Sequence, residues 1–373
     1  MKALLADRSA RTRVFTHSSK VIALEPNEGG YIVHTDLKEA VGVDGVVLAI
    51  GALPPVPIAE VHREALAGGR YLPDAWQAPK PDQAPQRVVV LGSGLTAVDV
   101  ILTAATNWPD AQIVALSRHG RLPATHRMEP SEPYAFQAQL IESLRADASI
   151  RNWVRLLRET AIGDGADWRA LIDGLRPVTV ELWRLLDLTQ RKRFLRHVRW
   201  AWETVRHRMP PQTAQAIELL RDEGRLSVIA GRIRRVEGRT PLTLTYRQRD
   251  DGSMQKIGAD LAIQATGLHT AVQRTSHPLL IQMFRHGLVR ADAQGLGIDA
   301  DVHGRVKDAE GKVVPQMRVV GTLLRGVLWE CTALPDIRLA AARLVHEMPR
   351  ELRLRGFDES CSRRSADEIA ATR

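Results

Sequence analysis

Cysteine is scarce in this sequence. Only Cys331 and Cys361 occur in 373 residues, and they form no Cys-x-x-Cys pair. Two cysteines so far apart supply neither a disulfide framework nor a dithiol redox centre. Disulfide-stapled proteins and dithiol redox enzymes are therefore excluded.

Long apolar runs are also missing. No stretch of 18 apolar residues occurs, and the apolar run near the N-terminus is too short for a signal peptide. We therefore expect a cytoplasmic protein without a membrane partner.

Acidic residues are fewer than basic ones, 43 against 52, which gives a formal net charge of +9. Such an excess raises the question of a nucleic-acid partner. The arginines are spread over many segments, however, and no nucleic-acid-binding motif accompanies them. We therefore expect no nucleic-acid partner, and the positive field would favour small anionic ligands. The oligomeric state stays open.

The most informative segment that is present is residues 86–100, where a β-branched run breaks into Gly-x-Gly-x-x-Ala and continues with helical spacing. This pattern is typical of a dinucleotide-binding turn, in which Gly92 turns the chain, Gly94 lets the backbone approach a pyrophosphate and Ala97 allows close helix packing. The alternative is a tight structural turn between a strand and a helix. The candidate binding residues are Gly92, Ser93, Gly94, Leu95, Thr96 and Ala97.

The next strand, residues 112–116, is not followed by an acidic residue. An NAD-selective site usually places an acid there for the ribose 2′-hydroxyl, whereas the 2′-phosphate of NADP needs cations. This chain has Ser117, Arg118 and Arg121 instead. The pattern favours NADPH over NADH; the alternative is that both arginines are ordinary solvated loop residues.

The remaining pattern predicts a nested α/β fold. Short strands are expected at 14–16, 21–24 and 31–35, then a buried strand that ends at Gly51, and further strands at 226–230, 242–248, 259–265 and 318–321. The strand end Ala265-Thr266-Gly267 resembles Ala49-Ile50-Gly51. We therefore expect two Rossmann-like dinucleotide-binding domains, one inserted in the other: 1–55 and 271–350 as one domain, 86–270 as the other, and 351–373 as a charged tail.

A helical insertion is predicted within the second domain, at residues 132–223. Its aromatic residues are interpreted as core, and its basic face as solvated. These aromatic residues are Trp153, Trp168, Trp183, Trp200 and Trp202, and the basic face is Arg191, Lys192, Arg193, Arg196 and Arg199.

These residues resemble flavoproteins with two dinucleotide-binding domains, and more closely the FAD/NAD(P)-binding protein family typified by a flavin-dependent urate hydroxylase. The resemblance runs from about residue 12 to 345. It rests on Val-Leu-Ala-Ile-Gly-Ala-Leu-Pro (47–54), Leu-Gly-Ser-Gly-Leu-Thr-Ala-Val-Asp (91–99), Ser-Arg-His-Gly-Arg-Leu-Pro (117–123), Phe-Leu-Arg-His (194–197), Arg-His-Arg-Met-Pro (206–210), Gln-Ala-Thr-Gly (264–267) and the segment 320–338.

The resemblance implies bound FAD and NADP, and a flavin-dependent NAD(P)H oxidoreductase of monooxygenase-like type. Hydride would pass from NADPH to FAD and then to O₂ or another acceptor, because in such enzymes the cofactors carry the chemistry. Segment 321–338 would close over the flavin, and the insertion would shape the substrate pocket. The implied flavin neighbours are Gly321, Thr322, Trp329, Glu330 and Thr332, and the implied crossing between domains is Ala265, Thr266 and Gly267.

No catalytic side chain is predicted, and no metal site. His119, His197 and His207 are candidate proton donors, for which a structural or solvated role is the alternative. The flavoprotein class also opens with a strand and a Gly-x-Gly-x-x-Gly turn that holds FAD, and residues 1–85 contain no such turn. We therefore expect the first βαβ unit to be absent. The alternative function is a nucleotide-binding protein without catalysis that no longer retains FAD.

Overall fold

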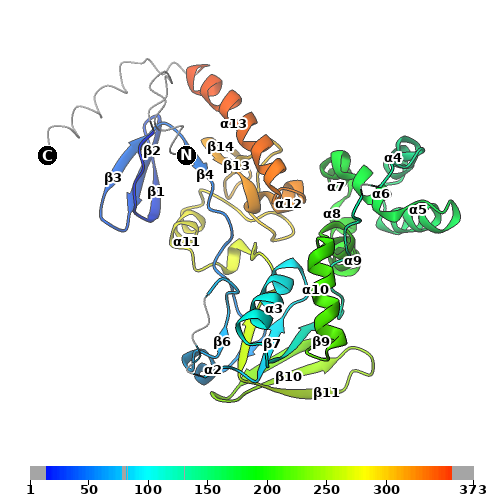
Figure 1. Cartoon of the computed structure of the whole chain (residues 1–373). Coiled ribbons are helices and arrows are strands. Elements are labelled where there is room, and N and C mark those ends of the chain that lie inside the picture. The colour runs from blue at the N-terminus through cyan, green and yellow to red at the C-terminus, as the bar shows by residue number, and fades with distance from the viewer. Residues whose placement is uncertain (1–13, 78–80, 82, 130, 355–373) are drawn as a thin grey trace.

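The computed structural model describes residues 14–77, 81, 83–129 and 131–354. Figure 1 shows three lobes. The large-sheet lobe holds β5–β12 with α2, α3 and α10, the small-sheet lobe holds β1–β4, β13 and β14 with α11–α13, and the helical lobe holds α4–α9.

The large-sheet lobe is built on eight strands in the order β11-β10-β9-β8-β7-β12-β6, with β5 beside β9. The sheet is parallel from β6 through β12, β7 and β8 to the first part of β9. Beyond it, β10 pairs antiparallel with both β9 and β11. The strands are β5 (Glu60–Val61), β6 (Tyr71–Leu72), β7 (Arg87–Leu91), β8 (Gln112–Ser117), β9 (Leu226–Glu237), β10 (Leu242–Gln248), β11 (Met254–Ala259) and β12 (Leu261–Gln264), and the helices are α2 (Arg63–Ala67), α3 (Leu95–Asn107) and α10 (Pro211–Asp222).

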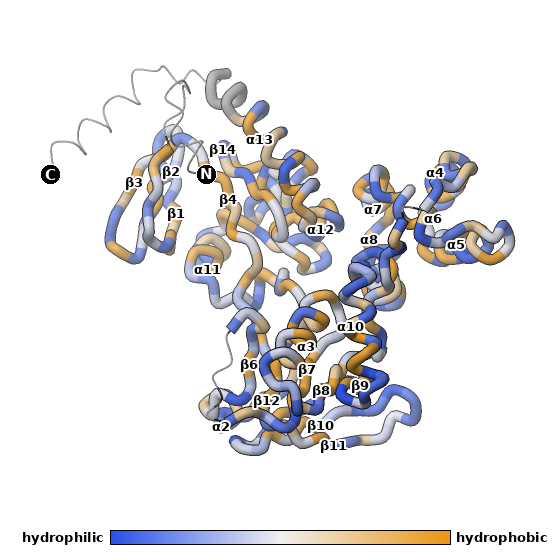
Figure 2. The backbone as a smooth tube through the Cα atoms, in the orientation of Figure 1, coloured by the Kyte–Doolittle hydropathy of each residue, from blue (hydrophilic) through white to orange (hydrophobic). Residues whose placement is uncertain are grey.

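Strand β7 is central because it is apolar on both faces. Its residues Val88, Val89, Val90 and Leu91 are fully buried, as expected for a strand covered on both sides of a parallel sheet. One face packs against α3 and α10, and the other against β10 and α2. Figure 2 shows hydrophobic segments gathered where α3 faces β7 and β8.

The small-sheet lobe combines two three-stranded sheets. One is an antiparallel meander in the order β1-β2-β3, and the other has the order β13-β14-β4, with β14 and β4 parallel. Residues far apart in the chain thus share one core, because β4 precedes and β14 follows the whole large-sheet lobe. The elements are β1 (Val21–Asn27), β2 (Gly30–Thr35), β3 (Ala40–Val43), β4 (Val46–Leu48), β13 (Arg305–Lys307), β14 (Val313–Val319), α11 (Pro278–Arg285), α12 (Arg325–Leu328) and α13 (Leu334–Leu354).

The helical lobe lies between α3 and α10 in the sequence. A π-helical turn, Phe194–Val198, joins α8 to α9. The lobe contacts the small-sheet lobe through α7 and α12, where the Trp183 indole N–H donates to the carbonyl oxygen of Gly326 at 2.9 Å. Its helices are α4 (Gln137–Ala146), α5 (Ile150–Gly163), α6 (Trp168–Gly174), α7 (Thr179–Leu185), α8 (Leu188–Arg193) and α9 (Arg199–Arg206).

The predicted α/β class, the inserted arrangement and the helical insertion are present. Several local predictions were wrong. Residues 14–16 are not a strand, β9 extends to Glu237, and β11 was not predicted. The large sheet also includes β5 and β6, which precede residue 86. Helix α13 runs to Leu354, and the rest of the predicted charged tail, with Cys361, lies outside the described residues. In the described part of the chain, no helix is long and apolar enough to cross a membrane.

Candidate nucleotide-binding site

The turn between β7 and α3 is shaped by two glycines with different surroundings. Gly92 has a φ of +132°, and a Cβ there would lie 2.2 Å from the carbonyl oxygen of Ala265. Only glycine fits, because the end of β12 crosses the turn at this point. Gly94, the N-cap of α3, has no heavy atom within 4 Å of its would-be Cβ. The backbone is therefore open to a ligand at the helix N-terminus.

The first turn of α3 carries no competing acceptor. Its N-cap is a glycine without a side chain, and it contains no acidic residue. The amides of Leu95 and Thr96 lie in this first turn, and Ala97 is buried against the sheet. Free amides and the helix dipole favour an anion at such a terminus. The arrangement leaves the N-terminus of α3 accessible to an anionic group.

Ser117 connects this turn to the end of β8. Its Oγ accepts hydrogen bonds from the Ser93 hydroxyl at 2.8 Å and from the Gly120 amide at 3.0 Å. The loop after β8 is thus fixed against the loop after β7. Both loops lie at the carboxyl ends of adjacent parallel strands, where ligands of open α/β sheets bind.

Positive charge gathers beside Ser117. Arg118 and Arg121 are exposed, and Arg249 joins them from the turn after β10, with its guanidinium donating to the Arg118 carbonyl oxygen at 3.3 Å. The same guanidinium lies 2.7 Å from His119 Nδ1. The indole of Trp200 stacks on the His119 ring, with 4.4 Å between the two ring centres.

His119 is held in its neutral form. Burial and the positive charges of Arg249, Arg118 and Arg121 lower its pKa below the ordinary value. A neutral imidazole can accept the hydrogen bond from Arg249, whereas a protonated one cannot. His119 is therefore positioned to hold an arginine rather than to donate a proton.

Arg249 and Trp200 were missed by sequence reasoning. Arg249 is 131 positions from Arg118, and only the sheet order β8-β9-β10 brings them together. Trp200 was interpreted as core, but it is half-buried and lies on His119. No local sequence signal could have placed either residue here.

A second strand edge carries the segment that was expected near a flavin. Strands β4 and β14 end side by side, and the Val320 amide donates to the Leu48 carbonyl oxygen at 3.1 Å. Each is followed by a glycine with a φ of +78°, Gly51 and Gly321, and neither has a heavy atom within 4 Å of its would-be Cβ. The backbone at this edge is open to close approach by a flat group. The exposed Gly267, after β12, has a φ of +82° and the same open surroundings, and Thr266 before it is also exposed.

The next residues of that segment face the helical lobe. Trp329 is only 4% exposed; its ring stacks on Trp183 at 5.0 Å and meets Phe194 edge-on at 4.9 Å. Its backbone has a φ of +57°, which is strained for a bulky residue. Thr322 is buried and Thr332 is half-buried. The structure thus places Trp329 in an aromatic cluster with Trp183 and Phe194.

Glu330 joins the small-sheet lobe to the helical lobe through a hydrogen bond and an ion pair. Its Oε1 accepts from the Trp202 indole at 2.9 Å, and His207 Nε2 lies 3.9 Å from its Oε2. Burial raises the pKa of Glu330, but the hydrogen bonds from His207 and Trp202 and the charge of Arg206 lower it to a net value below the ordinary range. Glu330 is therefore ionised near neutral pH. In the described ranges, no group of histidine, cysteine and acidic side chains could hold a metal ion.

Two residues of the basic face that was predicted to be solvated contact other side chains or backbone of the helical lobe. Arg191 lies over the Trp183 ring and donates to the Trp183 carbonyl oxygen, and Arg199 pairs with Glu203 at 3.0 Å. Lys192, Arg193 and Arg196 are exposed as predicted. His197 is exposed as well.

Known structures share this architecture. L-lysine 6-monooxygenase from Pseudomonas syringae superposes with a TM-score of 0.60 at 20% identity, over 89% of this chain and 71% of that one. An ornithine N-hydroxylase from Kutzneria sp. 744, with reduced FAD, NADP⁺ and L-ornithine, gives 0.57 at 15% identity, over 89% and 71%. The FAD-bound cadaverine monooxygenase of desferrioxamine biosynthesis from Erwinia amylovora gives 0.53 at 13% identity, over 90% and 68%.

The chain therefore has the fold of flavoproteins with two dinucleotide-binding domains, and the resemblance given by the sequence motifs is confirmed at this level. More particularly, the family model of the pyridine nucleotide-disulphide oxidoreductases matches residues 5–129, which include the β7–α3 turn. No curated protein sequence matches the chain.

Proposed function

We propose that the protein is a flavin-dependent NAD(P)H oxidoreductase of monooxygenase-like type, which uses NADPH and acts on a small-molecule substrate. One observation carries the proposal: the open N-terminus of α3 lies beside a cluster of arginines at the end of β8. A phosphate-binding turn and a cationic ribose-end site are what NADPH requires.

The residues of the turn fit NADPH in a simple way. The diphosphate would lie over Gly94 and accept from the amides at the start of α3. The 2′-phosphate would lie between Arg118 and Arg121, because guanidinium groups bind phosphate oxygens through two parallel hydrogen bonds. Neutral His119 keeps Arg249 in place beside them. The two arginines then select NADPH over NADH.

The edge formed by β4 and β14 fits the flavin part of FAD. Gly51 and Gly321 leave space that a Cβ would fill, and Thr322 is fixed just after the strand end. FAD, when bound, supplies the redox chemistry, and the chain binds it, orients it and excludes water. The three superposed enzymes act on lysine, ornithine and cadaverine, and two of them contain FAD. This supports FAD and a small substrate here; a cytoplasmic location belongs to the same proposal.

The test is a visible absorbance spectrum of the purified chain after incubation with FAD and desalting, followed by anaerobic addition of NADPH. We expect retained flavin absorbance that bleaches with NADPH and returns with air. The variant Gly321→Val should lose flavin but keep NADPH binding, because its strain and bulk are confined to the β14 edge. A colourless chain that still binds NADPH would contradict the proposal and favour the non-catalytic nucleotide-binding alternative.

A further inference from the structure

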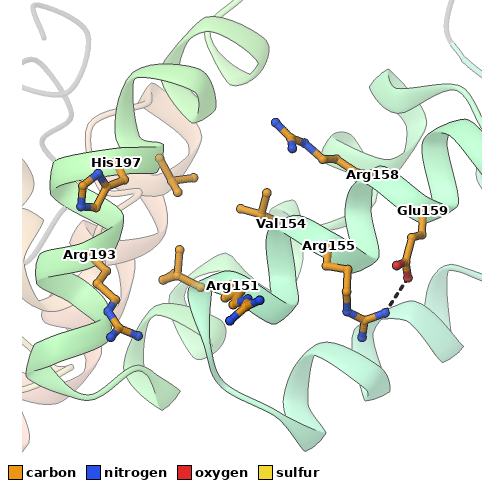
Figure 3. Close-up of a pocket in the computed structure, with 9 residues that line it drawn as sticks. Arg151, Val154, Arg155, Arg158, Glu159, Arg193 and His197 are labelled. Atoms are coloured by element: carbon orange, nitrogen blue, oxygen red, sulfur yellow. Dashed lines mark hydrogen bonds and ion pairs between the residues drawn. The ribbon is translucent and has the colours of Figure 1, made fainter.

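A basic cleft lies in the helical lobe, away from the β7–α3 turn. It has a volume of about 720 Å³ and opens between α5 and the segment around the π-helical turn. Figure 3 shows its side chains on these two elements. The cleft is lined by Ile150, Arg151, Val154, Arg155, Arg158, Glu159, Arg193, His197 and Val198.

Its charges are not balanced. Glu159 is the one acidic residue in the lining, and it pairs with Arg155 at 2.6 Å. The side chains of Arg151, Arg158 and Arg193 have no hydrogen bond or ion pair to any of the residues that the structure describes. Like charges that face one cleft repel one another. Three such guanidinium groups in one cleft do not stabilise the lobe, and each can bind an oxyanion that enters it.

An apolar pocket of about 70 Å³ adjoins the cleft, and the two share Ile150, Val154 and Val198 as a wall. Trp183, Phe194 and Trp329 lie among the other side chains that line the pocket. Polar lining is almost absent. A ligand that spans both spaces needs an anionic group for the cleft and an apolar body for the pocket.

Trp329 adds a second, independent sign of a ligand. Its side chain is more than nine-tenths buried and lines the apolar pocket, and its indole N–H finds no acceptor among the described residues. A buried donor without a partner costs free energy unless a ligand supplies the acceptor. The rings of Trp183 and Phe194 hold the indole in place despite the strained backbone at this residue.

We propose that the cleft and the adjoining pocket form one binding site for a small organic oxyanion, whose phosphate or carboxylate lies among Arg151, Arg158 and Arg193 and whose apolar body carries an acceptor for the Trp329 N–H. The site is distinct from the nucleotide site and does not depend on the proposed redox activity.

The observations favour a small molecule over a nucleic acid. Non-specific binding of single strands needs aromatic faces on which bases stack. The aromatic rings here are buried, with Trp183 at 3%, Phe194 at 8% and Trp329 at 4% exposure. A polymer could contact the arginines but could not enter the pocket.

The experiment is isothermal titration calorimetry on the full chain with five probes: phenyl phosphate, 4-nitrophenyl phosphate, benzoate, inorganic phosphate and a single-stranded DNA oligonucleotide. We expect phenyl phosphate to bind about tenfold more tightly than inorganic phosphate, the effect of burying about two methylene-sized groups. Benzoate against phenyl phosphate distinguishes a carboxylate ligand from a phosphate ligand. Equal affinity for phenyl phosphate and inorganic phosphate, or tighter binding of the DNA, would overturn the proposal.

Three variants locate the site. Arg158→Gln and Arg193→Gln should each weaken phenyl phosphate binding about two- to fivefold, the range of exposed charge pairs. Arg196→Gln removes the same charge from the π-helical turn but does not line the cleft, and should change nothing. An equal loss in all three would mean a general field effect and would overturn the assigned site.

Trp329→Phe keeps an aromatic ring and removes the N–H. It should weaken 4-nitrophenyl phosphate, whose nitro group supplies an acceptor, more than phenyl phosphate, which has none in its apolar body. The same loss for both ligands would exclude the contact with Trp329. Because all readouts are binding in the absence of flavin, failure here leaves the redox proposal untouched, and the reverse also holds.

Discussion

Gly92 and Gly94 are two residues apart, and one motif thereby combines a folding role with a proposed binding role. Gly92 is required by its own chain, since β12 occupies the space where a Cβ would be. Gly94 is surrounded by open space. The sequence pattern predicted the turn itself, because a strand, a turn and a helix in succession leave few other geometries, and the binding role of Gly94 stays a prediction.

Gly92→Ala should lower the free energy of unfolding by about 2–4 kcal/mol, from the clash with the Ala265 carbonyl and the positive φ. Gly94→Ala is the matched control: its φ of −83° suits alanine, so stability should hold while NADPH affinity falls. Urea unfolding and fluorescence titration with NADPH measure the two effects. Equal destabilisation by both variants would exclude the proposed division of roles.

Arg118 was a candidate from the sequence, whereas Arg249 was not, and Arg118 is the residue proposed to bind the 2′-phosphate. Arg118→Gln should weaken NADPH binding about tenfold or more and leave NADH binding unchanged, because a hydrogen-bonded charge pair is worth ~1.5–3 kcal/mol. Arg234→Gln, an exposed arginine on β9, is the charge control. Titration of both nucleotides with both variants is the measurement. A parallel loss for NADPH and NADH would rule out 2′-phosphate recognition by Arg118.

At the scale of elements, a helix or strand could be predicted when consecutive residues determine it, and not when a distant partner does. Strand β7 and helix α3 are encoded by consecutive residues, so their pattern could be read directly. Strand β11 is mostly exposed, and it exists because it pairs with β10. The π-helical turn Phe194–Val198 lies within a helical stripe that periodicity alone describes as continuous. Elements set by distant partners carry no local signal.

Helices α9 and α12 are joined by Glu203, which accepts from Arg325 at 2.6 Å and from Arg199 at 3.0 Å. Burial raises the pKa of Glu203, and the two arginines lower it to a net value below normal. Glu203→Gln leaves the mostly buried Arg325 without a carboxylate. We expect a loss of about 2 kcal/mol, less than the ~3–5 kcal/mol of a fully buried pair.

Urea unfolding of Glu203→Gln tests this link between the lobes. The control is Glu142→Gln, which breaks an exposed pair with Arg145 and should cost no more than about 0.5 kcal/mol. If both variants lose the same small amount, the lobes are held together by their apolar contacts and not by this ion pair.

At the scale of the whole molecule, the inserted arrangement was predictable because two similar strand ends flank the β7–α3 unit. The contacts between the lobes could not be predicted from the sequence. The contacts of Trp183 with Gly326 and of Trp202 with Glu330 join residues more than 120 positions apart. Such pairs follow from the final packing, and the sequence shows only that each partner can form a hydrogen bond.

The whole chain should lose stability as the pH falls from 7 to about 5. Burial lowers the pKa of His269 and His277, and burial with nearby arginines lowers that of His119. In the unfolded chain these groups titrate near ~6.5. Below that pH the unfolded state therefore takes up protons that the folded state does not, and its population rises until the lower folded pKa values are passed.

Two other groups act in a different pH range, which makes the assignment testable. The pKa values of Glu203 and Glu330 are below normal, so their contribution is present above the unfolded carboxylate pKa of ~4.3 and is lost only as the pH falls further. Melting temperatures between pH 8 and 5 should thus decline mainly through the histidines, and His119→Gln should flatten part of that decline. A melting temperature that stays constant or rises as the pH falls over this range would show that the fold does not hold the histidines neutral. It would also contradict the role of neutral His119 as the acceptor that keeps Arg249 at the proposed nucleotide site.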